Sequence, residues 1–214
     1  MGTDTGVGKT LVSCALIHTM RRAGLAPVPF KPVASGSEEG EGLANDDTRR
    51  LIAASGRPLT LDEVTPYRYL PAIAPHIAAA EASRPIDLER LRAHAERLAA
   101  DGPLVVEGAG GLLVPVDDRQ TLADLAVQLG LPVVLVVGMR LGCINHALLT
   151  AEAIRARGLT LAGWVANAID LGFERPEENR HTLQMRLAAP LLASIAWSPQ
   201  PDASTIPVQV PALQ

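Results

Sequence analysis

The stretch MGTDTGVGKT, residues 1–10, decides the expected fold. Gly6 and Gly8 permit a tight turn whose backbone N–H groups point at phosphate oxygens, and the dipole of a following helix strengthens that attraction. Lys9 can reach the β- and γ-phosphates of a nucleotide, and the Thr10 hydroxyl can ligate Mg²⁺. Because the stretch also opens a well-formed helical pattern, it predicts a phosphate-binding loop and not a chance glycine-rich turn.

The spacing of this loop departs from the usual pattern of Gly, four residues, then Gly-Lys-Ser/Thr. Thr3 stands at the position of the first glycine and Gly2 lies one residue further out, so five residues separate Gly2 from Gly8. Such a loop normally follows a buried strand, and only Met1 precedes it. We therefore expect that the first strand is missing, either because the chain was truncated or because its start was misassigned.

Apolar runs alternate with amphipathic stretches along the rest of the chain. Helices are expected over residues 10–23, 46–55, 75–81, 87–100, 121–129, 145–157 and 175–187, and strands over 28–33, 104–107, 132–138, 161–167 and 191–196, with 57–86 otherwise irregular. This alternation predicts an α/β fold: a P-loop NTPase-like, doubly wound, mainly parallel sheet with helices on both faces. We expect one domain over residues 1–214, with an extended tail over residues 199–214.

Composition excludes several classes of protein. The net charge of −4 gives no basic surface for nucleic acid. No apolar run reaches the length of about 18 residues that spans a bilayer. The two cysteines offer neither a disulfide framework nor metal-ligand spacing, so a reducing cytoplasm is the expected location. Aromatic residues make up only 3% of the chain, which favours an aliphatic core of the kind that covers parallel strands.

Lysine is rare in this sequence. Of the 19 basic residues, only Lys9 and Lys31 are lysines. A lysine ammonium is a compact point charge, whereas an arginine guanidinium is a broad fork, so a site that needs a point charge against phosphate does not readily accept arginine. A lysine at a strand end, such as Lys31, is more often a surface residue whose charge reaches into solvent. The scarcity of lysine favours a functional role for both.

Two sets of carboxylates are candidates for holding a cation. Asp46 and Asp47 follow Asn45, where they can cap a helix, bind Mg²⁺, or do both. Glu107 ends the buried run LVVE and is followed at once by the glycine-rich turn GAGG. Nucleotide-hydrolysing folds place a metal-binding carboxylate at such a strand end, and an unpaired buried charge would be costly.

Several polar residues leave two interpretations open. Ser35 and Ser37 can hydrogen-bond a substrate or cap a turn. Asn167 ends a strand, where its amide can recognise a purine or simply form a turn. Cys143 and Asn145 follow the strongest strand and, taken alone, are typical of a small buried residue and a helix cap.

Together these segments resemble the dethiobiotin synthetase family. The matching stretches are GTDTGVGKT (2–10), KPVASGS (31–37), NDD (45–47), PH (75–76), VEGAGG (106–111), LPVVLVVG (131–138), LGCINHALLTAEAI (141–154) and LAGWVAN (161–167). They occur in the family's order over most of residues 2–197. KPVASG and LGCINH are the specific motifs, and the five-residue spacing in the phosphate loop is itself the family's form.

The resemblance implies roles for particular residues. Lys31 and Lys9 would be catalytic, and Thr10, Asp47 and Glu107 would hold Mg²⁺. The nucleotide site would comprise Gly6, Val7, Gly8, Lys9, Thr10, Leu11, Asp47, Glu107, Gly108, Ala109, Gly110 and Asn167, and the substrate site Thr5, Ser35, Gly110, Cys143, Ile144 and Asn145. Cys143–Asn145 would reach the substrate's carboxylate end across a homodimer interface. Of the roles that the resemblance implies, adenine recognition has the least support, because Ala168 and Ala196 stand where the family usually has an acidic residue and a proline.

The reaction implied by the resemblance joins 7,8-diaminopelargonate and CO₂ to give dethiobiotin, with ATP as co-substrate and Mg²⁺ as cofactor. Two other classes are weighed against it. A partitioning-type switch ATPase shares this loop but would need a partner-binding terminal helix. An amidating ligase of the same superfamily would need an additional glutamine-hydrolysing domain with a catalytic cysteine.

Overall fold

The computed structural model describes residues 1–39 and 43–211. The helices are α1 (Lys9–Arg22), α2 (Asp46–Ser55), α3 (Leu61–Val64), α4 (Pro75–Glu81), α5 (Leu88–Ala99), α6 (Leu122–Leu129), α7 (Cys143–Ala156) and α8 (Pro176–Arg186). The strands are β1 (Val28–Phe30), β2 (Val33–Ser35), β3 (Tyr67–Tyr69), β4 (Leu104–Val106), β5 (Val133–Met139), β6 (Leu161–Ala168) and β7 (Leu191–Ile195). No helix in these residues combines the length and apolar character needed to cross a membrane.

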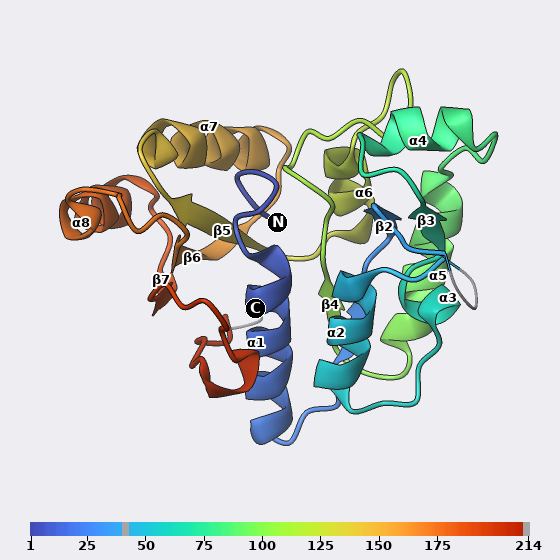
Figure 1. The fold of residues 1–214 in the computed structure, drawn as a ribbon, viewed down its shortest axis with the longest axis horizontal. Helices are drawn as coiled ribbons and strands as arrows, with labels where there is room; N and C mark the ends of the chain where they lie inside the picture. Colours follow the sequence, from blue (N-terminus) through green and yellow to red (C-terminus); the bar gives the residue numbers. More distant parts are fainter. Residues whose placement is uncertain (40–42, 212–214) are drawn as a thin grey trace.

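All of the named strands pair in parallel, which confirms the predicted α/β class. β1 pairs with β4, β2 pairs with β3, and β5, β6 and β7 form a three-stranded sheet in that order. In Figure 1, α1 runs between the three-stranded sheet with α7 and α8 on one side and the β1–β4 pair with α2 on the other. The apolar residues of α1 accordingly enter two core clusters, Val12 and Ala15 against β5 and Ile17 and Met20 against α2.

The first three residues extend the three-stranded sheet at its β5 edge. The Met1 amino group donates to the Val134 carbonyl at 2.9 Å, Val136 N donates to the Met1 carbonyl at 2.9 Å, and Thr3 N donates to the Val136 carbonyl at 2.9 Å. Gly2 and Val136 form an isolated parallel bridge. Although no named strand precedes α1 in the described residues, residues 1–3 thus pair as the end of a strand would.

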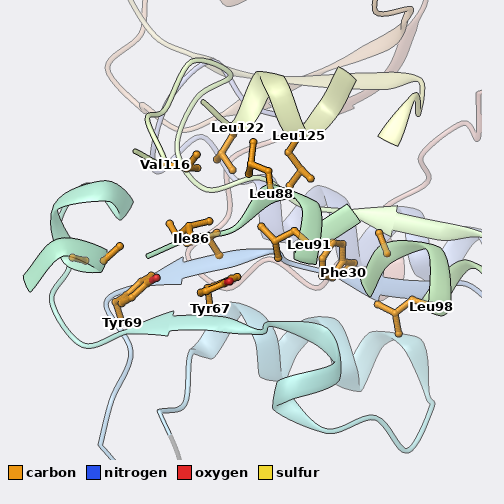
Figure 2. Packing of buried hydrophobic residues seen from close by; sticks show 14 of the residues in the cluster. Phe30, Tyr67, Tyr69, Ile86, Leu88, Leu91, Leu98, Val116, Leu122 and Leu125 are labelled. Atoms are coloured by element: carbon orange, nitrogen blue, oxygen red, sulfur yellow. The ribbon is translucent and has the colours of Figure 1, made fainter. Parts of the chain in front are cut away.

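The largest core cluster lies beneath β1 and β3 and is closed by α5 and α6 (Figure 2). Phe30 and Leu91 are fully buried, and Tyr67 and Tyr69 lie beside them. The predicted helix face of α5 is confirmed, because Leu88, Leu91, Ala95 and Leu98 are its buried residues. Asp87 caps this helix by accepting a hydrogen bond from Arg90 N at 3.1 Å.

Two predicted boundaries were wrong. The run 28–33 is not one strand but two, β1 and β2, because the chain breaks its pairing at Lys31 and Pro32. The segment 57–86, expected to be irregular apart from one helix, also contains α3 and β3. The short strand β3 was missed because only three residues pair, at the register Val33↔Tyr67 to Ser35↔Tyr69.

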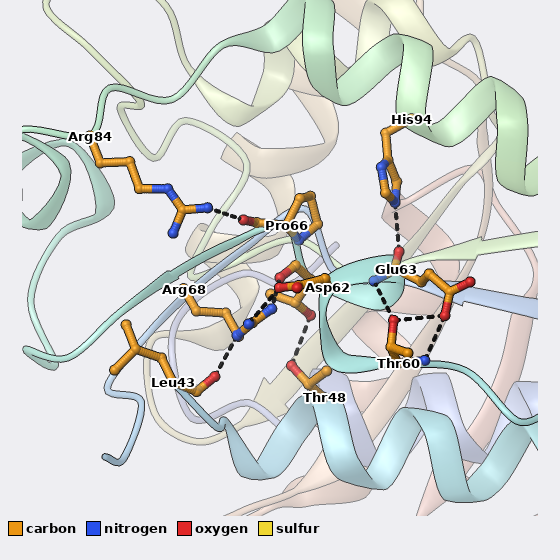
Figure 3. A network of polar contacts seen from close by, with 10 residues as sticks. Leu43, Thr48, Thr60, Asp62, Glu63, Pro66, Arg68, Arg84 and His94 are labelled. Atoms are coloured by element: carbon orange, nitrogen blue, oxygen red, sulfur yellow. Dashed lines mark hydrogen bonds and ion pairs between the residues drawn. The ribbon is translucent and has the colours of Figure 1, made fainter. Parts of the chain in front are cut away.

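Polar side chains hold the segment 57–86 in place, mostly by hydrogen bonds to backbone carbonyls (Figure 3). Arg68 donates to the carbonyls of Leu43 and Thr65 and forms an ion pair with Asp62 at 2.7 Å. The Thr48 and Thr65 hydroxyls are hydrogen-bonded at 2.8 Å and fully buried. Such contacts join residues distant in sequence, so hydrophobic periodicity gives no signal for them.

The expected tail packs against the domain as far as it is described. Residues 203–205 form η1 beside α1, Val208 is buried, and Gln209 N donates to the Leu192 carbonyl at 3.0 Å. Residues 212–214 of the predicted tail, and 40–42 of the predicted loop after Ser35, lie outside the described residues.

Removing a core side chain from the three-stranded sheet tests this packing. Leu135 on β5 is fully buried, whereas Leu171, which follows β6, is 73% exposed. We expect Leu135→Ala to lower the free energy of unfolding by about 2–5 kcal/mol, because it leaves a cavity in close-packed surroundings. Leu171→Ala should change it by less than about 0.5 kcal/mol. Equal effects in urea unfolding would contradict this assignment of the core.

Candidate nucleotide-binding active site

Four elements bring the predicted charged residues together. Lys31 follows β1, Glu107 follows β4, Asp47 lies in the first turn of α2, and Thr10 lies in the first turn of α1. Because β1 and β4 are parallel neighbours, Lys31 and Glu107 leave the sheet at the same edge. That carboxyl edge is where open α/β sheets bind their ligands.

A buried ion cluster forms at this edge. Lys31 Nζ donates to Glu107 Oε1 at 2.6 Å and to Asp47 Oδ2 at 2.8 Å. Lys31 is 4% exposed and Glu107 2% exposed, whereas the Asp47 side chain is 39% exposed. Lys31 is therefore not a surface lysine, and its ammonium lies between two carboxylates and reduces their mutual repulsion.

The pairing sets the protonation of this cluster. Burial alone would lower the pKa of Lys31, but the charges of Glu107 and Asp47 outweigh it and raise that pKa above 10.5. Burial alone would raise the pKa of Asp47, but Lys31 outweighs it and holds that pKa below 3.8. The stabilisation from Asp47 is therefore complete above pH 3.8 and is lost as pH falls through the lower folded pKa. The stabilisation from Lys31 is complete below pH 10.5 and is lost as pH rises through the higher folded pKa.

The three predicted metal ligands lie together. Thr10 Oγ1 donates to Glu107 Oε1 at 2.9 Å, and Asp47 accepts from the same Lys31 ammonium as Glu107. Glu107 Oε2 is buried and has no hydrogen-bond partner among the described residues. A buried carboxylate oxygen without a partner is unusual in a folded protein, and oxygen donors of these kinds are the ligands that Mg²⁺ prefers. The residues thus fit a Mg²⁺ ion.

The phosphate loop has the backbone geometry that its glycines predict. Gly6 and Gly8 have φ angles of 74° and 89°, in the left-handed region where residues with a side chain are strained. Gly8 is the N-cap of α1, so the free N–H groups of the first turn face the loop. Lys9 Nζ donates to the Asp4 carbonyl at 2.8 Å, so the side chain at the end of the loop folds back onto its beginning.

Asn167 supports this loop from β6. Its Nδ2 donates to the Val7 carbonyl at 2.9 Å, and a Cβ atom at position 8 would collide with the same amide nitrogen. Gly8 is therefore required for two independent reasons, its backbone conformation and this close approach. Asn167 is 5% exposed and also lines the cleft, so a structural role is established for it while purine recognition stays a prediction.

A cleft of about 910 Å³ opens over the loop and the ion cluster. Of the predicted site residues, those lining it are Thr5, Gly6, Gly8, Lys9, Thr10, Leu11, Lys31, Ser35, Asp47, Glu107, Ala109, Gly110 and Asn167. Val7 and Gly108 are not among its lining residues, and Val7 instead packs in the core. Cys143, Ile144 and Asn145 begin α7 and line no part of this cleft.

Sequence reasoning missed other residues of the cleft. Arg50 on α2 and Trp197 after β7 both line it. Arg140 forms an ion pair with Asp4 of the loop at 2.6 Å. In the sequence, only the position of Arg50 one helical turn after Asp46 could have indicated a role for it. The ion pair between Arg50 Nε and Asp46 Oδ2 is long, at 3.5 Å. Trp197 carried the signal of being one of two tryptophans in the chain.

A left-handed glycine loop that opens a helix beside a buried lysine–carboxylate cluster, at the carboxyl edge of a parallel sheet, defines a P-loop nucleotide-binding protein. A family profile described as "AAA domain" matches residues 1–205. The chain is 55% identical to the ATP-dependent dethiobiotin synthetase BioD of Aromatoleum aromaticum, over 91% of this chain and 87% of that protein.

Dethiobiotin synthetases from other bacteria are similar to this chain to nearly the same degree. The one from Pseudomonas aeruginosa strain UCBPP-PA14 is 52% identical over 91% of this chain and 86% of its own length. The one from Nitrosospira multiformis is 50% identical over 94% and 88%. The chain belongs to the dethiobiotin synthetase family.

Removal of the Lys31 ammonium tests the ion cluster. We expect Lys31→Met to lower the free energy of unfolding by about 3–5 kcal/mol, because it leaves Glu107 as an uncompensated buried charge. Adding Glu107→Gln should restore part of that loss, since the two buried side chains at positions 31 and 107 are then both neutral. Arg92→Met, which removes the exposed pairs with Glu89 and Glu96, should cost about 1 kcal/mol or less. If the double variant loses as much as the sum of its single variants, the two residues do not interact as described.

Proposed function

We propose that this protein is an ATP-dependent dethiobiotin synthetase, a cyclo-ligase of biotin biosynthesis. It converts 7,8-diaminopelargonate, CO₂ and ATP into dethiobiotin, ADP and phosphate. The observation that carries this proposal is the cleft in which both lysines of the chain meet Asp47, Glu107 and the phosphate loop. Relatives bearing this enzyme's name, at 50–55% identity, support the choice of reaction.

The chain's own residues divide the work of binding. Backbone N–H groups of Gly6–Thr10 bind the triphosphate, and Lys9 leaves the Asp4 carbonyl to contact the β- and γ-phosphates. Asn167 lines the cleft beside Gly8, and we assign it to the base of the nucleotide. Thr5, Ser35 and Gly110 line the remaining wall and contact the diamine. The buried Ser35 hydroxyl, which has no partner among the described residues, is free to bond a substrate group.

The reaction proceeds in three bond-forming steps. One amine of the diamine adds to CO₂ and loses a proton, which gives a carbamate. A carbamate oxygen then attacks the γ-phosphorus of ATP, ADP leaves, and a mixed carbamic-phosphoric anhydride forms. The second amine attacks the carbonyl carbon, phosphate leaves, and loss of a proton completes the cyclic urea.

Electrostatics is the protein's main contribution to these steps. Carbamate and triphosphate are both anions, so the lysine ammonium groups of positions 9 and 31 stabilise their approach. Thr10, Asp47 and Glu107 would hold a Mg²⁺ ion, which supplies further positive charge against the phosphates. Lys31 begins paired with two carboxylates and lines the cleft, and its flexible side chain lets the ammonium turn toward the carbamate.

A homodimer completes the site in this proposal. Asn145 is exposed at the start of α7, far enough from its own cleft that it lines no part of it. Leu141, just before α7, and Leu149, on α7, are 90% and 56% exposed, so this region offers apolar surface to a partner. Pairing this surface with a second copy would bury both leucines and bring Cys143–Asn145 to the substrate's carboxylate end. A location in the cytoplasm is consistent with both buried cysteines being free.

The proposed reaction is tested by measuring whether ATP cleavage depends on the diamine. We expect phosphate release to require both 7,8-diaminopelargonate and bicarbonate, and to match dethiobiotin formation one to one. Lys31→Gln should lower the turnover rate by about a hundredfold or more, because it removes a charge that acts on the reacting anions. ATP affinity, measured by calorimetry, should change by less than tenfold.

The same assay separates the competing function. Phosphate release that is independent of the diamine would favour a switch ATPase of the partitioning kind. Near-normal turnover by folded Lys31→Gln would remove Lys31 from the mechanism. A thermal melt of each preparation supplies the check that the variant is folded under the assay conditions.

The proposed dimer is tested at the exposed surface of α7. We expect the wild-type chain to sediment at twice its mass of 22.5 kDa and Leu149→Glu to sediment as a monomer, because the change buries a charge in the interface. The monomer should bind ATP and lose dethiobiotin synthesis. Leu25→Glu, at an exposed residue that follows the C-terminal end of α1, is the matched control and should stay dimeric. A wild-type chain that is monomeric and active at micromolar concentration would overturn this part of the proposal.

A further inference from the structure

Helix α2 packs beside α1, so its first turns lie next to the phosphate loop (Figure 1). Leu51 of α2 shares a core cluster with Cys14 and Ile17 of α1. Asp47, in the first turn of α2, reaches the ion cluster at the edge of the sheet. Arg50 follows one turn later on the same side of the helix and lines the nucleotide cleft.

The charged side chains of this cleft carry a small excess of positive charge. Among the residues that the structure describes, the cleft is lined by three cations, Lys9, Lys31 and Arg50, and by two carboxylates, Asp47 and Glu107. Without Arg50 these charges would cancel, although a nucleoside triphosphate is a polyanion. Arg50 therefore gives the cleft the sign of charge that attracts such a ligand.

Arg50 is only weakly held by its surroundings. Its one ion pair within the described chain joins Nε to Asp46 Oδ2 at 3.5 Å, and the two side chains are 56% and 77% exposed. An exposed pair one helical turn apart favours the paired state by only about a factor of two in an equilibrium constant. A guanidinium group binds phosphate more strongly, through two parallel hydrogen bonds. The side chain can therefore leave Asp46 for a phosphate at little cost.

The guanidinium group of Arg50 lies close to the first turns of α1. Burial and the charge of Glu107 raise the pKa of Cys14 to about 12, and the charge of Arg50 acts in the opposite direction. Leu11, in the first turn of α1, lines the same cleft as Arg50. The free N–H groups of that turn form a site for anions. The cation of α2 and the anion site of α1 thus face the same space.

We propose that Arg50 is a phosphate-binding residue of the nucleotide cleft, whose guanidinium group leaves Asp46 and hydrogen-bonds the phosphates of the bound nucleoside triphosphate. This assignment rests on the proposed function, because it takes ATP to be the ligand of the cleft. It adds a cation from α2 to the lysines that the phosphate loop and the end of β1 supply. Asp46 holds the guanidinium group until the nucleotide binds.

Arg50→Gln tests this contact, and Arg49→Gln is its matched control. Arg49 is also more than half exposed on α2 and has a weak ion pair, to Glu38 at 3.7 Å, but it does not line the cleft. Both variants lower the net charge equally. In calorimetry, Arg50→Gln should raise the dissociation constant of ATP by about tenfold or more, because a charge-assisted hydrogen bond is lost. Arg49→Gln should change it by less than about twofold.

Inorganic tripolyphosphate shows which part of the nucleotide Arg50 contacts, because this probe has the phosphates but neither base nor ribose. Its affinity should fall in Arg50→Gln by a factor similar to that for ATP. A loss for ATP without a loss for tripolyphosphate would place Arg50 at the ribose or the base and overturn the proposal. ATP affinity within twofold of wild type would also overturn it. So would equal losses in the two variants, because a general effect of surface charge would then explain them.

Salt dependence separates a contact between charges from a change in the shape of the cleft. The difference in ATP affinity between wild type and Arg50→Gln should shrink by about threefold or more between about 0.05 and 0.5 M KCl, because salt screens exposed charges. A difference that does not vary with salt would overturn the proposal.

These binding measurements require no turnover, so their outcome is separate from that of the proposed reaction. A wild-type chain that binds ATP but forms no dethiobiotin would overturn the reaction and leave the assignment of Arg50 standing. A chain that forms dethiobiotin and binds ATP equally well with and without Arg50 would overturn the assignment alone. A wild-type chain that binds no ATP would overturn both.

Discussion

The ammonium group of Lys31 is the interaction on which the site depends. It joins the end of β1 to the end of β4 through Glu107 and to the start of α2 through Asp47. Without it, two carboxylates would share a buried edge of the sheet and repel each other. The arrangement is costly to build, because a lysine and a glutamate must leave water together. A hydrophobic pair would be a cheaper way to close this edge, so the retained charges indicate selection for chemistry.

The phosphate loop is held by elements on every side of it. Thr10 links the first turn of α1 to Glu107, Asn167 supports the Val7 carbonyl from β6, and residues 1–3 pair with β5. Because these supports come from both halves of the sheet, the loop's conformation is a property of the whole fold. The two glycines permit that conformation, but the surrounding strands select it.

Sequence patterns predicted the α/β class and most helices, because aliphatic periodicity is strong in a chain with few aromatic residues. The family resemblance assigned Lys9, Thr10, Lys31, Asp47 and Glu107 to one site, and the parallel pairing of β1 with β4 explains why Lys31 and Glu107 lie together. The sequence patterns failed at β3, because only three of its residues pair and the side-chain hydrogen bonds that hold the segment leave no periodic signature. They also gave no hint that Asn167 bonds the loop, because that contact joins residues 160 positions apart.

The scarcity of lysine acquires a practical meaning in the folded chain. Most proteins carry amines over their whole surface, so amine-directed chemistry reports an average over many sites. Here both lysines line a single cleft, and the other side chains that carry a fixed positive charge are arginine guanidinium groups. Isotopic methylation, which keeps the positive charge, would therefore place side-chain labels in that cleft alone. The NMR signals of these two labelled side chains would therefore report directly on ligand binding in the cleft.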